Sequence, residues 1–316
     1  MVRGVLQSGV MKTLYTVLIV LLGVVSAMAE QTWVSLSKVG ELEGKKRQVK
    51  LSGVKAELKA LDLKIRGEGA DAFVVTDTRK EPNGVLLLDV AFRPTVSRGY
   101  FSAELIVKEG KAVRVIQLRG VAIKALEGKN EPPLQEVLDS LGTGIDAGGK
   151  RLSLSTKEER IGDSVAVTRF QPVQGSIVRI TPLARYSPPG VTPFGLIIEE
   201  GEQLRLEVLG ELANTTKGRP DAHQSMSPPL HDGKSVVVVT KPPEQFGLFL
   251  KAHKYTSLTF PGKSEGSKIK YTARIYPVKS FQGKAVKDAY IVGFEEASNG
   301  DYQDAVFLIE GVKAVK

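Results

Sequence analysis

The sequence VLLLDVAFRPTVSRGYFSAELIVKEGKAVRVIQL, residues 85–118, contains three apolar segments separated by turn residues. The segments 85–92, 100–107 and 112–118 are rich in the branched and aromatic residues that favour β-strands. Arg93-Pro94 and Arg98-Gly99 interrupt the first connection, and Glu109-Gly110-Lys111 is typical of a hairpin turn. The stretch therefore predicts consecutive antiparallel strands of one sheet.

The same alternation of short strand-like segments and turns extends in both directions. Residues 30–124 contain further segments of this kind near 33–36, 48–51, 56–65 and 72–75, which predict an immunoglobulin-like β-sandwich. Residues 151–316 contain more such segments between Pro- and Gly-rich loops, which predict a second sandwich of the immunoglobulin or jelly-roll kind. We therefore expect an all-β protein with two antiparallel β-sandwich domains.

A short helical connector is predicted between the two domains, within residues 125–150. Pro133 suits the first turn of a helix, and Gly142 suits its C-terminal cap. The helix is expected over residues 133–141, because apolar residues recur there at helical spacing. These residues are Leu134, Val137, Leu138 and Leu141.

The N-terminus has the pattern of an export signal. A positive charge at Lys12 precedes an apolar run over residues 14–25, and residues 26–29, Ser-Ala-Met-Ala, form an Ala-x-Ala cleavage site. We predict a signal peptide over residues 1–29, with Met11 as the true start and residues 1–10 as an extension ahead of it. The alternative is an uncleaved membrane anchor, although the run is short for about 30 Å of hydrocarbon.

The chain contains no cysteine. Exported domains without disulfides favour bacterial export over passage through an endoplasmic reticulum. We expect a periplasmic, cell-surface or secreted protein that meets the membrane only through its export signal.

The net charge of +9 comes from scattered basic residues. Nucleic-acid binding requires basic residues gathered on one face with an insertion helix or stacking aromatics, and neither pattern is present. The expected partner is an envelope component, a polysaccharide or another protein, and not a nucleic acid.

The last strands of the first predicted domain resemble a known family. Residues 90–94, 99–105 and 115–122 show F-x-P, G-x-F-x-A-x-L and V-x-L-x-G-x-A patterns. These are similar to bacterial immunoglobulin-like domains of the abnormal-spindle/hydin type. The resemblance covers about a third of the domain and implies a binding or spacer module.

An acidic turn between two strand-like segments is the one candidate ion site in the sequence. Residues 290–311 read YIVGFEEASNGDYQDAVFLIEG. Calcium prefers several hard oxygen ligands, which carboxylates, amide oxygens and carbonyls supply. The candidate ligands are Glu295, Glu296, Asn299, Asp301 and Asp304. The alternative is a tight Asn-Gly hairpin turn with its acidic side chains in water.

This stretch also resembles the C-terminal signature of a bacterial extracellular domain of unknown function. That signature is G-[FW]-E-D followed by D-x-D-[FY]-N-D-x-V, and residues 293–296 and 299–307 match it, with an upstream match at 246–250. Three positions depart from it: Glu296 and Asn299 replace aspartates, and Gln303 replaces an asparagine. The resemblance implies a surface protein with calcium as its expected ligand.

Catalytic motifs are missing from the sequence, which has no G-x-S-x-G, H-E-x-x-H, P-loop or cysteine nucleophile. The leading hypothesis is an exported, non-catalytic protein with a binding or structural role, stabilised by calcium. A carbohydrate-binding module is an alternative, with Tyr186 as the best candidate for an exposed aromatic, although an anchor of its loop is the favoured role of this residue. A secreted hydrolase is a second alternative. His223, His231 and His253 are expected to be solvated loop residues.

Overall fold

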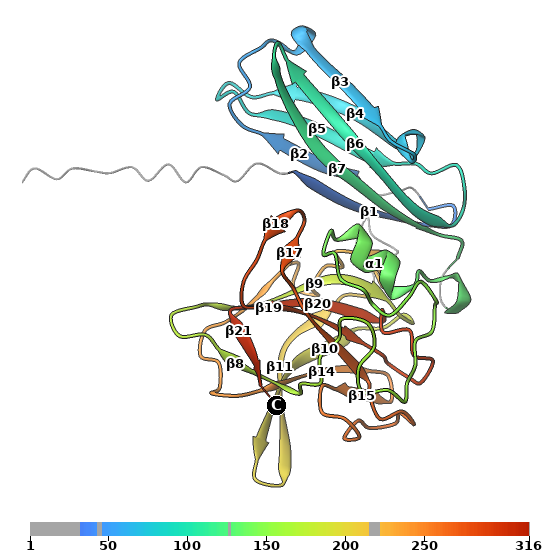
Figure 1. Cartoon of the computed structure of the whole chain (residues 1–316), viewed down its shortest axis with the longest axis vertical. Helices are drawn as coiled ribbons and strands as arrows, with labels where there is room; N and C mark the ends of the chain where they lie inside the picture. Colours follow the sequence, from blue (N-terminus) through green and yellow to red (C-terminus); the bar gives the residue numbers. More distant parts are fainter. Residues whose placement is uncertain (1–31, 43–45, 126–127, 215–221, 316) are drawn as a thin grey trace, which may run out of the picture.

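The computed structural model describes residues 32–42, 46–125, 128–214 and 222–315 of the protein. Figure 1 shows two β-rich domains arranged end to end, with helix α1 (Leu134–Ser140) between them. The predicted all-β fold class is confirmed, because antiparallel sheets dominate the described chain. The predicted signal peptide, residues 1–29, lies outside the described residues.

The N-terminal domain is a sandwich of two sheets with strand orders β1-β7-β6-β3 and β2-β5-β4. Its strands are β1 Trp33–Val39, β2 Lys46–Leu51, β3 Leu61–Arg66, β4 Phe73–Lys80, β5 Leu86–Phe92, β6 Gly99–Glu109 and β7 Ala112–Ile123. Two short 3-10 helices, η1 (Leu58–Ala60) and η2 (Ala70–Ala72), join them. The pairing of β1 with β7 is parallel, whereas the other pairings in this domain are antiparallel.

Alternating side chains from the two sheets form the core of this domain. Phe92 packs against Phe73 and Phe101, with ring centroids 5.2 Å and 5.4 Å apart. Gly120 faces the Phe92 ring, and a Cβ atom at this position would lie 2.3 Å from it. The glycine therefore allows the large aromatic ring to pack close to the backbone of β7.

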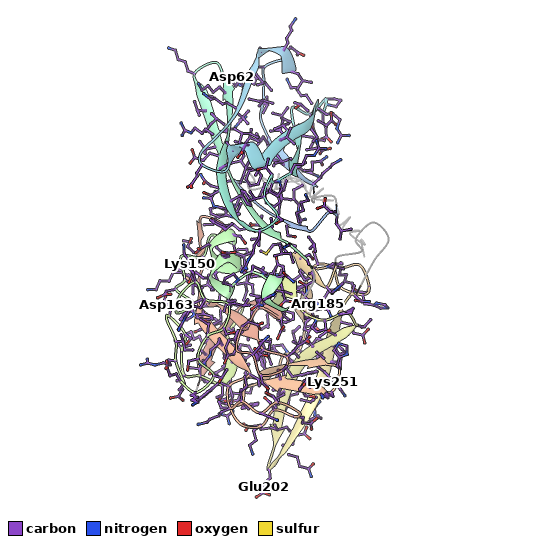
Figure 2. The ribbon with its side chains drawn as sticks, turned by 90° about the vertical axis from the view of Figure 1, so that its right-hand side faces the viewer. Asp62, Lys150, Asp163, Arg185, Glu202 and Lys251 are labelled. Carbon is purple, nitrogen blue, oxygen red and sulfur yellow. The ribbon has the colours of Figure 1, made fainter. Side chains whose placement is uncertain are left out.

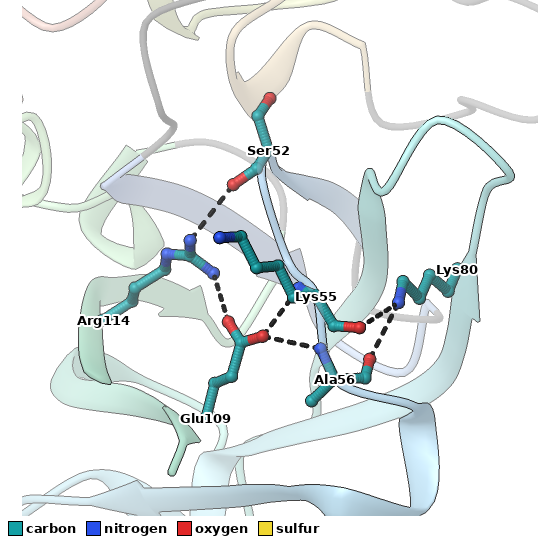
Figure 3. Close-up of polar contacts among 6 residues, drawn as sticks. All are labelled: Ser52, Lys55, Ala56, Lys80, Glu109 and Arg114. Atoms are coloured by element: carbon teal, nitrogen blue, oxygen red, sulfur yellow. Dashed lines mark hydrogen bonds and ion pairs between the residues drawn. The ribbon is translucent and has the colours of Figure 1, made fainter. Parts of the chain in front are cut away.

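Hydrogen bonds to Glu109 hold the loop that follows β2 (Figure 3). One carboxylate oxygen of Glu109 accepts hydrogen bonds of 2.6 Å from the backbone N–H groups of both Lys55 and Ala56. The Lys80 ammonium donates to the carbonyl oxygens of the same two residues at 2.9 Å. Arg114 bridges Glu109 to this loop. These contacts hold the loop after β2 against the end of β6.

The C-terminal domain contains a four-stranded sheet, β11-β10-β14-β15, and a sheet of order β12-β9-β20-β19-β16 in which β13 also pairs with β9. Its larger strands are β9 Val178–Tyr186, β10 Thr192–Glu200, β11 Gln203–Leu212, β14 Gly247–Ala252, β16 Ala273–Pro277, β19 Ala289–Phe294 and β20 Ala305–Glu310. Its shorter strands are β8 Arg169–Pro172, β12 Gln224–Met226, β13 Val237–Val239, β15 Tyr255–Leu258, β17 Ser280–Phe281, β18 Lys284–Ala285 and β21 Val312–Val315. Apolar residues between the two sheets form its core.

Helix α1 joins the two domains through a shared core. Its apolar residues pack with residues of both the N-terminal strands and the C-terminal domain. The Trp33 indole donates a hydrogen bond of 2.9 Å to the carbonyl oxygen of Ser140 at the end of α1. Gly142 follows the helix with φ +63°, which is the cap conformation expected from the sequence. None of the helices in the described ranges is long and apolar enough to cross a membrane.

Candidate metal centre

The loop between β19 and β20, residues 295–304, buries four carboxylates, which we call the loop carboxylates. They are Glu295, Glu296, Asp301 and Asp304. Gly300 and Tyr302 adopt φ values of +81° and +55°, so the chain folds back over the strand ends. A Cβ atom at Gly300 would lie 2.7 Å from the backbone oxygen of Leu154. The alternative of a tight Asn-Gly turn with solvated acidic residues is therefore wrong.

The Glu295 carboxylate organises this loop. Its Oε1 accepts hydrogen bonds from the backbone N–H groups of Ala297 at 2.8 Å and Asn299 at 3.3 Å. Its Oε2 accepts from the N–H groups of Gly300 at 2.6 Å and Asp301 at 3.0 Å. Four backbone N–H groups thus converge on this carboxylate, and these bonds fix the conformation of the loop around it.

Asp301 and Asp304 carry oxygen atoms that lie, together with one of Glu295, within 4.8 Å of one another. Asp304 Oδ2 accepts a hydrogen bond of 2.5 Å from the backbone N–H of Glu296. Asp301 Oδ2 accepts one of 2.7 Å from Nδ2 of Asn299, whereas Asp301 Oδ1 is buried without a hydrogen-bond partner. The fold thus brings three of the five predicted ligands together in a buried cluster.

A buried arginine, Arg185 on β9, lies close to the loop carboxylates. Figure 2 labels it in the part of the C-terminal domain nearest to the N-terminal domain. Its guanidinium donates hydrogen bonds to Ser187 Oγ at 2.8 Å and to the backbone oxygens of Pro188 at 3.1 Å, Gly190 at 2.8 Å and Ala213 at 3.0 Å. Burial lowers its pKa to about 10, although the charges of Glu296 and Asp304 oppose this. These hydrogen bonds of the guanidinium go to a hydroxyl group and to backbone oxygens, and not to the loop carboxylates.

Glu131 adds a fifth buried carboxylate from a distant part of the chain. It follows the 3-10 helix η3 (Gly128–Asn130) in the connector. Its two oxygens accept hydrogen bonds from Nε2 of Gln224 on β12 at 2.7 Å and from Nε2 of Gln303 in the loop at 3.3 Å. The negative charge of Glu131 acts on both Glu296 and Asp301. The connector is therefore part of the site.

Burial raises the pKa values of three loop carboxylates. Loss of solvation, followed by the charges of neighbouring carboxylates, raises the pKa of Asp301 to about 8. Burial also raises the pKa of Glu296 to about 7, although the charge of Arg185 opposes the rise. The pKa of Asp304 is well above its usual range for the same reason of burial. When these carboxylates are ionised, the buried negative charge in the site exceeds the positive charge that the protein supplies to compensate it.

Several buried oxygen atoms of the site have no hydrogen-bond partner. They are Asp301 Oδ1, Glu296 Oε1, Gln303 Oε1 and Gln224 Oε1. A buried acceptor without a partner costs about 1–3 kcal/mol, and native proteins contain few of them. All four are hard oxygen donors, the type that binds calcium and magnesium, and the cluster contains no imidazole or thiolate. These residues fit a hard divalent cation.

Two other predicted ligands have different surroundings. Asn299 is exposed, and its amide contacts Asp301 through Nδ2, while its Oδ1 accepts from the Asp301 backbone N–H at 3.3 Å. Glu296 is buried but lies outside the three-carboxylate cluster. Sequence reasoning missed Arg185, Glu131 and Gln224, because no local pattern marks residues that meet only through the fold.

Two side chains that the sequence left as candidates for exposure are buried. Tyr186, the best aromatic candidate for an exposed sugar-binding face, is completely buried at the end of β9 and packs in the core shared with α1. His223 is also buried beside this strand end, whereas His231 and His253 are exposed as expected. Among the described residues, none of the three histidines joins a group that could hold a metal.

The sequence was also compared with models of known protein families and with curated proteins. No family model matches the chain, and no curated protein matches it.

Proposed function

We propose that this protein is an exported, non-catalytic binding or structural protein whose C-terminal domain holds a calcium ion. The observation that carries the proposal is the buried cluster of Glu295, Asp301 and Asp304, whose oxygens lie within 4.8 Å of one another beside unpartnered buried oxygens. Export rests on the pattern of residues 1–29. A role for the N-terminal sandwich as a binding or spacer module rests on its resemblance to bacterial immunoglobulin-like domains.

Calcium fits this set of donors better than the other common divalent ions. Zinc sites are usually built from thiolate and imidazole ligands, and neither occurs in the cluster. Magnesium demands near-ideal octahedral geometry and retains several waters, so it rarely occupies an all-protein cage. Calcium accepts six to eight oxygens in irregular geometry. An irregular loop with several carboxylates and amide oxygens nearby supports calcium.

The cation would have a clear energetic role. Asp301 and Asp304 are buried close together. The guanidinium of Arg185 donates its hydrogen bonds to Ser187 and to backbone carbonyls. Uncompensated buried charge is strongly unfavourable, so the metal-free loop must retain protons or open. A divalent ion compensates the charge and gives the unpartnered oxygens a ligand. Calcium binding is therefore expected to stabilise the folded domain.

Thermal unfolding with calcium and with chelator tests this proposal. An ion that binds only the folded state stabilises it by about 2.7 kcal/mol at a hundredfold excess over Kd. For two domains of this size that unfold as one unit, that corresponds to a rise in Tm of about 4–5 °C. Magnesium at the same concentration should produce a smaller rise.

Two variants make the experiment specific to the site. Asp301→Asn removes one buried negative charge, so it should abolish the calcium-induced rise in Tm without unfolding the metal-free protein. Asp71→Asn changes an exposed aspartate in η2 and should leave the rise unchanged. Equal Tm values in calcium and in chelator for the unmodified protein would rule the proposal out.

A further inference from the structure

A surface cleft of about 410 Å³ lies at the loop between β19 and β20, residues 295–304. Glu295 and Asp304, two members of the three-carboxylate cluster, line this cleft together with Glu131, Pro188 and Tyr255. Small-molecule sites typically occupy about 300–1,000 Å³, so the cleft is large enough for a ligand. The cluster and the cleft thus share Glu295 and Asp304, so a cation held by the cluster would lie beside the cleft.

The β14–β15 hairpin separates this cleft from a second one. Its tip residue His253 adopts a φ of +52°, an uncommon conformation for a residue with a side chain. His253 lines both the first cleft and a second of about 270 Å³. The second cleft is lined on its other side by the start of β10, including Thr192 and Pro193. The two clefts are thus neighbours that share His253 in their lining.

The charge of the first cleft selects against anionic ligands. The lining of the cleft includes four carboxylates, those of Glu131, Glu295, Glu296 and Asp304, and one ammonium, that of Lys254. A bound calcium ion would add two positive charges. With these groups ionised, the cleft therefore keeps one net negative charge even with the ion bound. A phosphate or an acidic polymer gains no electrostatic attraction from such a surface.

The remaining chemistry fits a sugar. Calcium takes six to eight oxygen ligands, more than the three clustered carboxylates supply with one oxygen each, and the hydroxyl groups of a neutral ligand can occupy positions that face the cleft. Tyr255 is half-buried in the cleft, and the Lys254 ammonium lies 5.4 Å from its ring centroid. Tyr255 and Pro188 both line the cleft and supply apolar surface on which the C–H face of a sugar ring can pack.

We propose that this cleft binds a neutral oligosaccharide, with neighbouring sugar hydroxyls coordinating the calcium ion and a sugar ring packing on Tyr255. This inference rests on the proposed calcium site and names its ligand class. His253, at the boundary of the two clefts, would contact successive sugar units.

Calorimetric titration of the purified protein with neutral glucan and mannan oligosaccharides tests the inference, in calcium and in chelator. We expect binding in calcium and none in chelator. Tyr255→Ala removes the ring and should weaken binding about tenfold, which is the upper range of an aromatic contact. Tyr255→Phe retains the ring and should bind within about twofold of the unmodified protein. Val238→Ala, an exposed residue of β13 outside the cleft, serves as the surface control.

The outcomes separate this inference from the proposal on which it depends. Calcium binding without any binding of neutral oligosaccharides overturns the sugar site and leaves the calcium site intact. Tighter binding of polygalacturonate than of neutral sugars also overturns it, because the argument from charge would be wrong. Absence of calcium binding removes both. Unchanged sugar binding by Tyr255→Ala overturns the assignment to this cleft.

Discussion

Carboxylates that are close in sequence in the β19–β20 loop have different structural roles. Glu295 accepts four backbone N–H groups and so shapes the loop, whereas Asp301 retains a buried oxygen without a partner. Glu296 interacts electrostatically with the buried guanidinium of Arg185. A sequence of acidic residues in a turn does not distinguish these roles, because they depend on which oxygens the folded backbone reaches.

The raised pKa of Asp301 predicts how the stability of the metal-free protein depends on pH. Its pKa is about 8 in the folded chain and about 3.9 in an unfolded chain. Between these values the folded state binds more protons than the unfolded state, so the free energy of unfolding falls as the pH rises. The stabilisation of the folded state by proton binding to Asp301 is complete below about pH 4 and is lost by about pH 8.

Urea unfolding in chelator at about pH 5 and pH 8 measures this effect. We expect the unmodified protein to lose more stability over this interval than Asp301→Asn, by on the order of a few kcal/mol. Calcium should remove most of the difference at pH 8, because the ion replaces the proton as the partner of the carboxylate. Equal pH dependence in the two proteins would show that Asp301 does not titrate in this range.

Among the helices and strands, the sequence predicted features that depend on local periodicity better than features that depend on long-range pairing. The apolar spacing expected for a helix over residues 133–141 corresponds to α1, Leu134–Ser140, since helical periodicity is a local property. Residues 56–65, expected as one strand, instead contain η1 followed by β3, because the strand begins only where pairing with β6 starts at Leu61. The hydrogen bond between Gln303 and Glu131 joins residues 172 positions apart in the sequence, and no local pattern predicts it.

The docking of α1 depends on one glycine. Gly142 has a φ of +63°, and a Cβ atom there would lie 2.6 Å from the Trp33 ring. Gly144 has a φ of +66° with nothing within 4 Å of its Cβ position. Alanine at either site carries a similar backbone cost of about 1–2 kcal/mol. Only Gly142→Ala also displaces the tryptophan.

We therefore expect Gly142→Ala to lose about 1–3 kcal/mol more stability than Gly144→Ala, the usual cost of overpacking a core. Urea unfolding of the two variants gives the difference, and the emission of Trp33 should shift only in Gly142→Ala. Equal losses would mean that the α1 junction accommodates the added methyl group.

Across the whole molecule, the loop of residues 295–304 is linked to the domain junction. Glu131 accepts a hydrogen bond from Gln224 on β12, and the N–H of Met226 on the same strand donates to Ser37 Oγ on β1 at 3.1 Å. Residues of both domains and α1 share one core. In Figure 2 the molecule extends from Asp62 at one end to Glu202 at the other, with this junction between them. The two sandwiches are thus expected to unfold together.

Trp33, the single tryptophan of the chain, reports on this coupling because it lies on β1 against α1. Calcium should raise the temperature of the Trp33 fluorescence transition by the same number of degrees as the transition seen by circular dichroism. A shift in circular dichroism with an unchanged Trp33 transition would mean that the loop stabilises the C-terminal domain alone.

Equilibrium dialysis of the metal-free protein against calcium, followed by measurement of the metal content, decides whether the acidic loop is a calcium site. Asp71→Asn is the control with an intact cluster, and Asp301→Asn combined with Asp304→Asn removes two of its three carboxylates. The account predicts one bound calcium per chain in the unmodified protein and in Asp71→Asn, and none in the double variant. Protein without bound calcium, or equal calcium in the double variant, would contradict it.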